Sequence, residues 1–286
     1  MTAVPGAVRD APGRDGGAAQ SPYATARVPV LRLPGSGRTR DEVAVEEPLE
    51  IRVGGSPLAV TMRTPGDDEE LALGFCLSEG LRPRSAWLPA DLAANTVEVD
   101  ADLAALGEKL EQRRRTFYTS ASCGVCGVGA IDAVAVHGPR NESALRVTEE
   151  VVVALPERLR AGQPGFAATG GLHAAGLFTA EGEMLCTRED VGRHNAVDKV
   201  VGWAFLAHMV PLETQVICTS GRVSFEIVQK AAMAGCAVIV AVGAPSTLAL
   251  KLASDRGVTV CGFVRDGRCV VYTEPARVVA GGLSGP

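Results

Sequence analysis

The residues best suited to chemistry are two cysteines three positions apart, Cys123 and Cys126, within the segment Ser122–Gly127. Two thiols at this spacing reach one another across a turn, and Gly124 and Gly127 leave the backbone free to bend. The neighbouring hydroxyl side chains offer hydrogen bonds that favour a thiolate. Half a zinc site, a dithiol redox couple and a sulfur carrier that holds a persulfide all fit this spacing.

Zinc needs two further ligands at a suitable spacing, whereas the sequence has no second C-x-x-C pair and its four histidines are scattered at positions 137, 173, 194 and 208. A thioredoxin-like couple has an aromatic neighbour in a strand–helix–strand unit, which is lacking here. The spacing therefore favours thiol chemistry, with zinc and a plain structural role left open. The other six cysteines lie in apolar segments and are predicted to be small buried side chains: Cys76, Cys186, Cys218, Cys236, Cys261 and Cys269.

A second group of polar residues fills the segment Cys186–Lys199, where Arg193 and His194 precede a predicted helix over 195–208. Asn195 is predicted to cap this helix, with Asp198 as its capping-box partner. Free backbone N–H groups at a helix start favour an anion, so Arg193 and His194 are candidates for binding a phosphate or a sulfur substrate. A solvated helix start with routine capping is the alternative.

Two turns, over 219–224 and 243–247, each follow a predicted strand and open a helix. Such turns meet at one edge of an α/β sheet, where ligands usually bind, so a nucleotide-phosphate pocket is expected there. The hairpin over 262–268 carries two arginines that either clamp a pyrophosphate or simply keep a turn soluble. The candidate binding residues are Thr219, Ser220, Gly221, Arg222, Phe263, Val264, Arg265, Asp266, Gly267, Arg268, Arg193 and His194.

Composition and charge exclude several classes of protein. The chain has 286 residues, 47% of them hydrophobic, and a formal net charge of -5, which argues against a dedicated nucleic-acid binder. The basic run over 113–115 is interpreted as a solvated linker. No apolar run approaches the roughly 18 residues of a membrane span, and the N-terminus shows no apolar signal region. We therefore expect a cytoplasmic protein that binds neither nucleic acid nor membrane.

The elements fall into three parts. Residues 1–40 lack an apolar period and are expected to form a disordered tail. Residues 41–115 are predicted to form a small α+β domain, with a hairpin that turns at Gly54 and Gly55 and a helix whose start carries the acidic run Asp67–Glu70. That acidic run is interpreted as a helix cap rather than a metal site.

Residues 116–286 are predicted to form a three-layer α/β domain, because strands and helices alternate along them. Strands are expected over 134–136, 173–178, 183–186, 215–219, 237–243 and 258–264, with a hairpin through Asp266 and Gly267 into a strand over 269–273. Helices are expected over 155–161, 195–208, 225–235 and 247–254. The predicted fold class is thus α/β (α+β), a three-layer domain joined to a small N-terminal α+β domain.

Together these segments resemble the FdhD family, the formate dehydrogenase accessory sulfurtransferases. The resemblance covers residues 45 to 280 and rests on four motifs, of which the second is very specific: Ser122–Gly127, Glu189–Lys199, Thr219–Arg222 and Gly262–Arg265. It implies a sulfur carrier that accepts sulfur from a cysteine desulfurase on Cys123 and Cys126. The sulfur then passes to a molybdenum (or tungsten) bis-guanine-dinucleotide cofactor, bound as cargo, before its insertion into formate dehydrogenase.

The resemblance favours Cys123 as the persulfide carrier and Cys126 as the second relay or resolving thiol. It also implies a fold similar to that of cytidine deaminases, but the cysteine pair lacks the preceding proline and no histidine begins an H-x-E motif, so deaminase chemistry and a resident metal are not expected. A guanine nucleotide is the expected ligand, with Asp190, Asp198 and Glu226 as candidates to recognise the base.

Two other functions fit the same motifs: a chaperone that holds the cofactor without transferring sulfur, and a thiol–disulfide oxidoreductase. A homodimer is expected, with the apolar helix over 195–208 as its candidate contact face.

Overall fold

The computed structural model of the chain describes residues 24–35, 37–90, 95–102 and 138–281. Its main element is a six-stranded sheet with the strand order β13-β12-β11-β10-β8-β9. The three central strands β10, β11 and β12 are parallel, and β8, β9 and β13 are antiparallel to their neighbours. The strands are β8 (His173–Thr179), β9 (Met184–Asp190), β10 (Gln215–Thr219), β11 (Val238–Ala241), β12 (Thr259–Arg265) and β13 (Arg268–Thr273).

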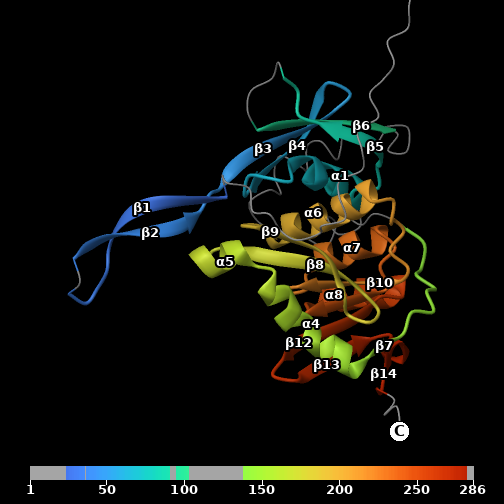
Figure 1. Cartoon of the computed structure of the whole chain (residues 1–286). Helices are drawn as coiled ribbons and strands as arrows, with labels where there is room; N and C mark the ends of the chain where they lie inside the picture. Colours follow the sequence, from blue (N-terminus) through green and yellow to red (C-terminus); the bar gives the residue numbers. More distant parts are fainter. Residues whose placement is uncertain (1–23, 36, 91–94, 103–137, 282–286) are drawn as a thin grey trace, which may run out of the picture.

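Helices cover both faces of this sheet (Figure 1). One face packs against α6 (Arg193–Leu206), α7 (Phe225–Met233) and α8 (Thr247–Arg256), and this layer holds the largest apolar core. The other face packs against α4 (Glu149–Ala161), where a second core includes Leu155, Phe178 and Cys218. Thr148 caps α4 through its side chain. The alternation predicted along the second half of the chain is confirmed, and helices lie on both sides of the sheet.

A smaller sheet with the strand order β4-β3-β6-β5 lies above the main layers. Its hairpin turns at Gly54 and Gly55, both with positive φ, as the sequence predicted. Helix α1 (Asp68–Ser78) begins with the predicted acidic turn, but no side chain caps it. The strands are β3 (Glu47–Val53), β4 (Ser56–Arg63), β5 (Arg82–Trp87) and β6 (Thr96–Asp102).

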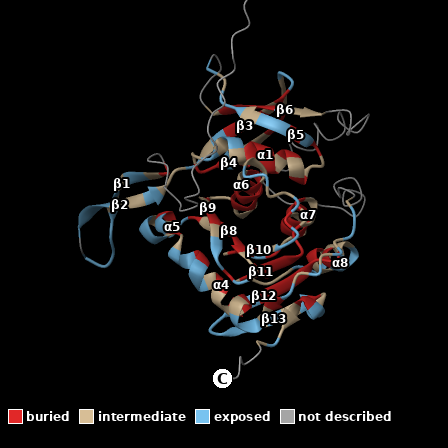
Figure 2. Cartoon of the chain, turned by 45° about the vertical axis from the view of Figure 1, so that its right-hand side comes forward, coloured by how far each residue is buried: buried red, intermediate tan, exposed pale blue. Residues whose placement is uncertain are grey.

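Helix α1 lies between the small sheet and α6, so it is buried on both sides (Figure 2). The two helices approach so closely that a Cβ atom on Gly202 would lie 1.8 Å from the carbonyl oxygen of Glu70, and one on Gly74 would lie 1.9 Å from that of Asp198. Only glycine fits at these two positions, because the obstacle in each case is backbone. The small sheet is thereby joined to the main sheet through a tight helix crossing, α1 against α6. Because α1 covers α6, the expectation that this helix forms a dimer face is wrong.

The expected disordered tail needs a correction over residues 25–40. Strands β1 (Thr25–Leu31) and β2 (Arg38–Ala44) form an antiparallel ribbon that projects from the body (Figure 1). β2 contacts the short helix α5 (Pro164–Thr169). The sequence shows no apolar period here because both faces of the ribbon are largely exposed, so a strand needs no alternation of apolar residues.

Further points concern the start of α6 and two predictions that fall outside the described residues. α6 begins at Arg193 with Gly192 as its N-cap, so Asn195 lies inside the helix and the predicted capping box is wrong. The predicted strand over 134–136 and the basic run over 113–115 lie outside the described residues. The predicted domain boundaries and the likeness to the cytidine deaminase fold stay predictions. Among the described residues, no helix is long and apolar enough to cross a membrane. One further short pair of strands is formed by β7 (Val147–Thr148) and β14 (Val278–Val279), the latter after the 3-10 turn Pro275–Arg277.

Candidate functional site

The turns that follow β10 and β11 are hydrogen-bonded to one another and to Phe263, at the irregularity near the end of β12, at the carboxyl edge of the parallel strands. The Gly243 amide donates to the Gly221 carbonyl at 3.1 Å, and the Phe263 amide donates to the Gly243 carbonyl at 3.2 Å. The Val223 amide donates to the Ala244 carbonyl at 3.1 Å. The prediction that these turns meet at one edge is confirmed. We refer to this edge as the rim: residues 219–226, 243–246 and 262–263, with His173, Arg193 and His194.

Close backbone packing holds the rim together. A Cβ atom on Gly243 would lie 2.7 Å from the Gly221 carbonyl oxygen and 2.9 Å from the Arg222 backbone, so a side chain at Gly243 would push the two turns apart. The Ser220 hydroxyl accepts a hydrogen bond from the Ala174 amide at 2.9 Å, which ties this turn to β8. Thr219 is fully buried. Thr219 and Ser220 therefore shape the rim from within.

Arg193 and His173 lie on the same side of Gly221. A Cβ atom on Gly221 would be in ordinary contact with Arg193 Cδ and His173 Nδ1, each at 3.5 Å. Arg193 Nε is buried and has no hydrogen-bond partner among the described residues. Within the described ranges no side chain caps the start of α6, so its first amides have no side-chain partner there either. A guanidinium beside open helix amides forms a site suited to an anion.

His194 lies beside the start of α7. Its Nε2 is 2.8 Å from Glu226 Oε2 and 3.0 Å from Ser224 Oγ. The hydrogen bond from His194 lowers the pKa of Glu226, against the opposing effect of burial, so this carboxyl is charged at neutral pH. The Ser224 side chain does not cap α7, and no other side chain of the described residues does so.

The sequence arguments did not select His173, which is the first residue of β8. Its partner across the β8–β9 pair is Asp190. Burial lowers the pKa of His173, and the neighbouring side chains of Arg193 and His194 lower it further, so the ring is neutral at neutral pH. The predicted strands over 173–178 and 183–186 were enough to place His173 near the site, because a hairpin of these two strands brings residue 173 beside the segment 189–194.

Other polar residues of the segment 189–199 point into the interior of the protein. Asp190, which is fully buried, accepts from Lys199 Nζ at 2.9 Å and from the Thr64 amide at 3.1 Å through Oδ2. Its Oδ1 accepts from the Gly192 amide at 2.8 Å and from Asn195 Nδ2 at 3.0 Å. Four donors thus fix the turn that leads into Arg193, and one of them comes from the end of β4.

A second buried ion pair joins α6 to α7 through Asp198, the residue that precedes Lys199 on α6. Asp198 accepts from Lys230 Nζ at 2.6 and 2.8 Å and from the Ser78 hydroxyl at 2.9 Å. Burial raises the pKa of Asp198, and the neighbouring Lys230 ammonium opposes that rise. At the edge of the same junction, Arg188 donates to both carboxylate oxygens of Glu70 at 2.6 and 2.8 Å. These contacts join α1, α6, α7 and β9.

Of the three carboxylates considered for base recognition, the structure leaves one accessible. Asp190 and Asp198 are 0% and 1% exposed and are already bound by lysines, so the idea that they recognise a base is wrong. The Glu226 side chain is 41% exposed and lies at the rim.

The predicted hairpin after β12 is present, with Asp266 and Gly267 in its turn at positive φ. Phe263 lies at the rim and is 42% exposed, whereas Val264 is buried on the α4 side of the sheet. Arg265 and Arg268 face one another across the two strands and are exposed. No hydrogen bond or ion pair in the described part of the chain joins these two arginines to the rim, so their role as a pyrophosphate clamp stays a prediction. Arg222 is likewise exposed.

Cys123 and Cys126 lie outside the described residues. Of the six other cysteines, five are buried as predicted, and Cys269 is only partly buried. Burial raises the pKa of Cys186 and Cys261 to about 12 and that of Cys236 to about 11, so these thiols are unreactive near neutral pH.

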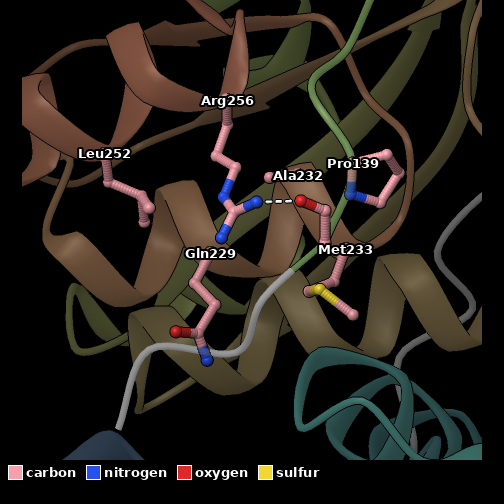
Figure 3. Close-up of a pocket in the computed structure, with 7 residues that line it drawn as sticks. Pro139, Gln229, Ala232, Met233, Leu252 and Arg256 are labelled. Atoms are coloured by element: carbon pink, nitrogen blue, oxygen red, sulfur yellow. Dashed lines mark hydrogen bonds between the residues drawn. The ribbon is translucent and has the colours of Figure 1, made fainter. Parts of the chain in front are cut away.

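The described chain resumes after the cysteine pair at Gly138, beside α7 and α8. Arg256 donates to the Gly138 carbonyl, next to Gln229 and Met233 (Figure 3). The hollow here holds about 10 Å³, which is room for about one water molecule and excludes it as a cofactor pocket. No group of three or more His, Cys, Asp or Glu side chains in the described ranges is arranged to hold a metal ion.

The comparisons with known proteins identify the family of the chain. The model of the FdhD/NarQ family matches residues 44–279. The chain is 46% identical to a sulfur carrier protein FdhD from Mycobacterium bovis, over 90% of this chain and 99% of that one. It is 42% identical to a sulfur carrier protein FdhD from Sulfolobus acidocaldarius, over 84% of this chain and 92% of that one.

A solved structure is similar over most of its length. It is a protein from Desulfotalea psychrophila assigned provisionally as a formate dehydrogenase accessory protein, with a TM-score of 0.68 and 25% identity over 89% of this chain and 98% of that one. The family model, the relatives and the shared fold give one conclusion: this chain is a member of the FdhD/NarQ family.

Proposed function

We propose that this protein is a sulfur carrier that accepts persulfide sulfur from a cysteine desulfurase and passes it to a molybdenum bis-guanine-dinucleotide cofactor destined for formate dehydrogenase. Membership of the FdhD/NarQ family and the names of the relatives support the sulfur-carrier role. The observation that carries the cofactor part is the rim, where Arg193 Nε is buried without a described partner beside two open helix starts.

The rim suits the phosphates and the base of a guanine dinucleotide. Arg193 and the first amides of α6 are donors for a phosphate, and neutral His173 beside them offers a further nitrogen. Glu226 is the accessible carboxylate, and a carboxylate accepts the N1–H and N2–H groups of guanine but not the edge of adenine. Phe263, exposed at the same edge, offers a ring for stacking on a base.

The sulfur step needs only thiol exchange. The Cys123 thiolate attacks the terminal sulfur of the donor persulfide, a new S–S bond forms, and the donor cysteine leaves as a thiolate. Cys126 then either takes over the terminal sulfur or attacks the inner sulfur of Cys123. In the second case a Cys123–Cys126 disulfide forms and hydrosulfide leaves, so that two thiols are oxidised while the transferred sulfur is reduced.

The test of sulfur transfer is intact-protein mass spectrometry after incubation with a cysteine desulfurase and cysteine. We expect an adduct of about 32 Da on the wild type and its loss in Cys123→Ala. The buried Cys218→Ala is a matched control, because its thiol has a raised pKa and should leave the adduct unchanged. An adduct that persists in Cys123→Ala and Cys126→Ala alike would overturn the carrier role.

A cofactor-holding chaperone and a thiol–disulfide oxidoreductase predict different results. A chaperone supports formate dehydrogenase activity in cells even as Cys123→Ala, whereas a carrier does not. An oxidoreductase reduces generic disulfides without a desulfurase. Titration with GDP and ADP tests the rim independently: binding of GDP that is tighter than that of ADP, with the preference lost in Glu226→Gln, is the expected result.

A further inference from the structure

Thr64 joins the small sheet to the turn that leads into the rim. It directly follows β4 and is 2% exposed. Its amide donates to Asp190 Oδ2 at 3.1 Å, its hydroxyl accepts from the Val191 amide at 3.1 Å, and its carbonyl accepts from Lys199 Nζ at 2.9 Å. The amide, the hydroxyl and the carbonyl of this one residue are therefore all bound to the segment 189–199.

The end of β4 also binds the start of α6 through Asn195. Asn195 Nδ2 donates to the Met62 carbonyl at 2.8 Å, and the Thr61 hydroxyl donates to Asn195 Oδ1 at 3.2 Å. Asn195 lies in the first turn of α6 and is 8% exposed. The turn and the helix start are thus held from the side of the small sheet.

Thr64 is itself held in place by its neighbour Arg63, which is also 2% exposed. Arg63 donates from Nε and Nη2 to the two carboxylate oxygens of Asp68, each at 2.9 Å, and this ties β4 to the first residue of α1. Arg63 Nη2 also donates to Asn95 Oδ1 at 2.7 Å. The Thr64 hydroxyl is therefore an acceptor at a fixed position.

The turn that Thr64 holds leads directly to Arg193. Between the buried Asp190 and Arg193 the chain has just Val191 and Gly192. The Gly192 amide donates to Asp190 Oδ1 at 2.8 Å, and the Val191 amide donates to the Thr64 hydroxyl. Without that hydroxyl the Val191 amide loses its acceptor, so the turn relaxes next to Arg193.

We propose that Thr64 is a positioning residue for the ligand at the rim, which sets the orientation of Arg193 through the Val191 amide. This inference rests on the proposed function, because it takes the rim as the site of the guanine dinucleotide. Thr64 is buried and acts through the turn, without contact with the ligand. A charge-assisted hydrogen bond depends steeply on distance and angle, so a small movement of Arg193 weakens binding. The small sheet thereby takes part in binding at the rim.

The experiment measures the affinity of the full chain for GDP by isothermal titration calorimetry. The variants are Thr64→Val, which keeps the shape of the side chain but removes the hydroxyl, and Thr64→Ser, which keeps the hydroxyl. The matched control is Thr259→Val. Thr259 is fully buried, its hydroxyl donates to the Glu274 carbonyl at 2.9 Å, and it begins β12, at the edge of the sheet opposite the rim. Thermal unfolding measures the stability that each variant loses.

We expect Thr64→Val to weaken GDP binding about fivefold and Thr64→Ser to restore most of the affinity. Thr259→Val should bind GDP like the wild type despite a comparable loss of stability. In an Arg193→Ala background, Thr64→Val should have no further effect, because the side chain that it positions is gone. Unchanged affinity in Thr64→Val, or a loss that adds fully to that of Arg193→Ala, would overturn the inference.

Hydrogen–deuterium exchange of the wild type decides the case in which Thr64→Val does not fold. Because linkage is reciprocal, GDP should slow amide exchange over residues 61–64, and residues 96–102 of β6 should be unaffected. Exchange over 61–64 that GDP leaves unchanged would overturn the inference. A wild type that binds no GDP would overturn the proposed function and this inference with it. GDP binding that Arg193→Ala weakens and Thr64→Val does not would overturn this inference alone.

Discussion

The segment 189–199 contributes residues to two regions of the molecule. The two regions differ in whether the charged side chains are buried with partners or partly exposed. On its inner side, at the junction of α1, α6 and β9, Asp190, Lys199 and Asp198 are buried and fully engaged by partners within the chain. On its outer side, at the rim, Arg193 and His194 are partly exposed and donors remain open. A dense polar motif in a sequence therefore need not be one site, because here some of its residues hold the fold together while others lie at the rim.

The largest expected effect is at the junction. Lys199→Met leaves the Asp190 carboxylate buried without its cation, which should lower the free energy of unfolding by about 3–5 kcal/mol. Urea denaturation followed by circular dichroism measures this loss. Asp190→Asn combined with Lys199→Met removes both charges and should recover part of the stability. A loss below about 1 kcal/mol in Lys199→Met would contradict the description of the junction.

Glycine substitutions test the same two regions, and we expect a change in unfolding free energy of intermediate size. Gly202→Ala places a methyl group on the Glu70 backbone, so we expect a loss of about 1–3 kcal/mol even though alanine favours a helix. Gly221→Ala, at the rim, meets Arg193 and His173 only at ordinary contact distance and should leave the unfolding free energy unchanged. Thermal unfolding of the two variants side by side measures the difference. Equal stability of the two would show that the helix crossing is looser than described.

At the rim, substitutions should affect binding and not folding. Arg193→Ala should weaken GDP binding about tenfold, or about 1.4 kcal/mol, because it removes the donor that has no described partner within the chain. Arg193→Lys should restore little of the affinity, since lysine keeps the charge but not the planar fork. Isothermal titration calorimetry measures the affinities, and the exposed Arg84→Ala is the control. Unchanged affinity in Arg193→Ala would remove this residue from the site.

The smallest expected effect is a pH dependence. The pKa of His173 lies below its ordinary value, so the ring is neutral at pH 7.5 and gains its proton only as the pH falls through that lowered value. A bound phosphate favours the protonated ring, so GDP affinity should rise by about threefold as the pH falls from about 7.5 to about 5.5. His173→Gln should lack this increment, and the comparison cancels the titration of the phosphate itself. Parallel pH profiles for the two proteins would exclude His173 from ligand binding.

Much of the fold was predictable because the main sheet alternates strands and helices with strong apolar patterns. The turns after β10 and β11 were placed correctly at one edge because parallel strands end on the same side of a sheet. The ribbon of β1 and β2 was missed because its strands bury neither face and so carry no alternation of apolar residues. The role of α6 as a dimer face was wrong because a helix that is apolar on all sides signals burial, and the sequence does not name the element, α1, that covers it.

The site was predicted in part. Arg193 and His194 were found because charged residues at a helix start suggest an anion site, but the same reasoning could not separate them from Asp190 and Asp198, which point inward. His173 was missed because its role depends on a contact across β8 and β9. For the hairpin arginines Arg265 and Arg268, the turn sequence predicts correctly that they are exposed. It does not identify what they bind.

The helix crossing between α1 and α6 has a consequence for synthesis on the ribosome. Residues of α1 precede their partners on α6 by more than 100 positions, and Phe205 and Leu206 of α6 complete the core of the small sheet. At about 5–20 residues per second, the ribosome needs many seconds to add the intervening chain. Throughout that interval the side of α1 that packs against α6 has no native partner. The nascent chain is therefore a substrate for general chaperones until α6 emerges, and the amino-terminal third of this protein cannot mature ahead of the rest.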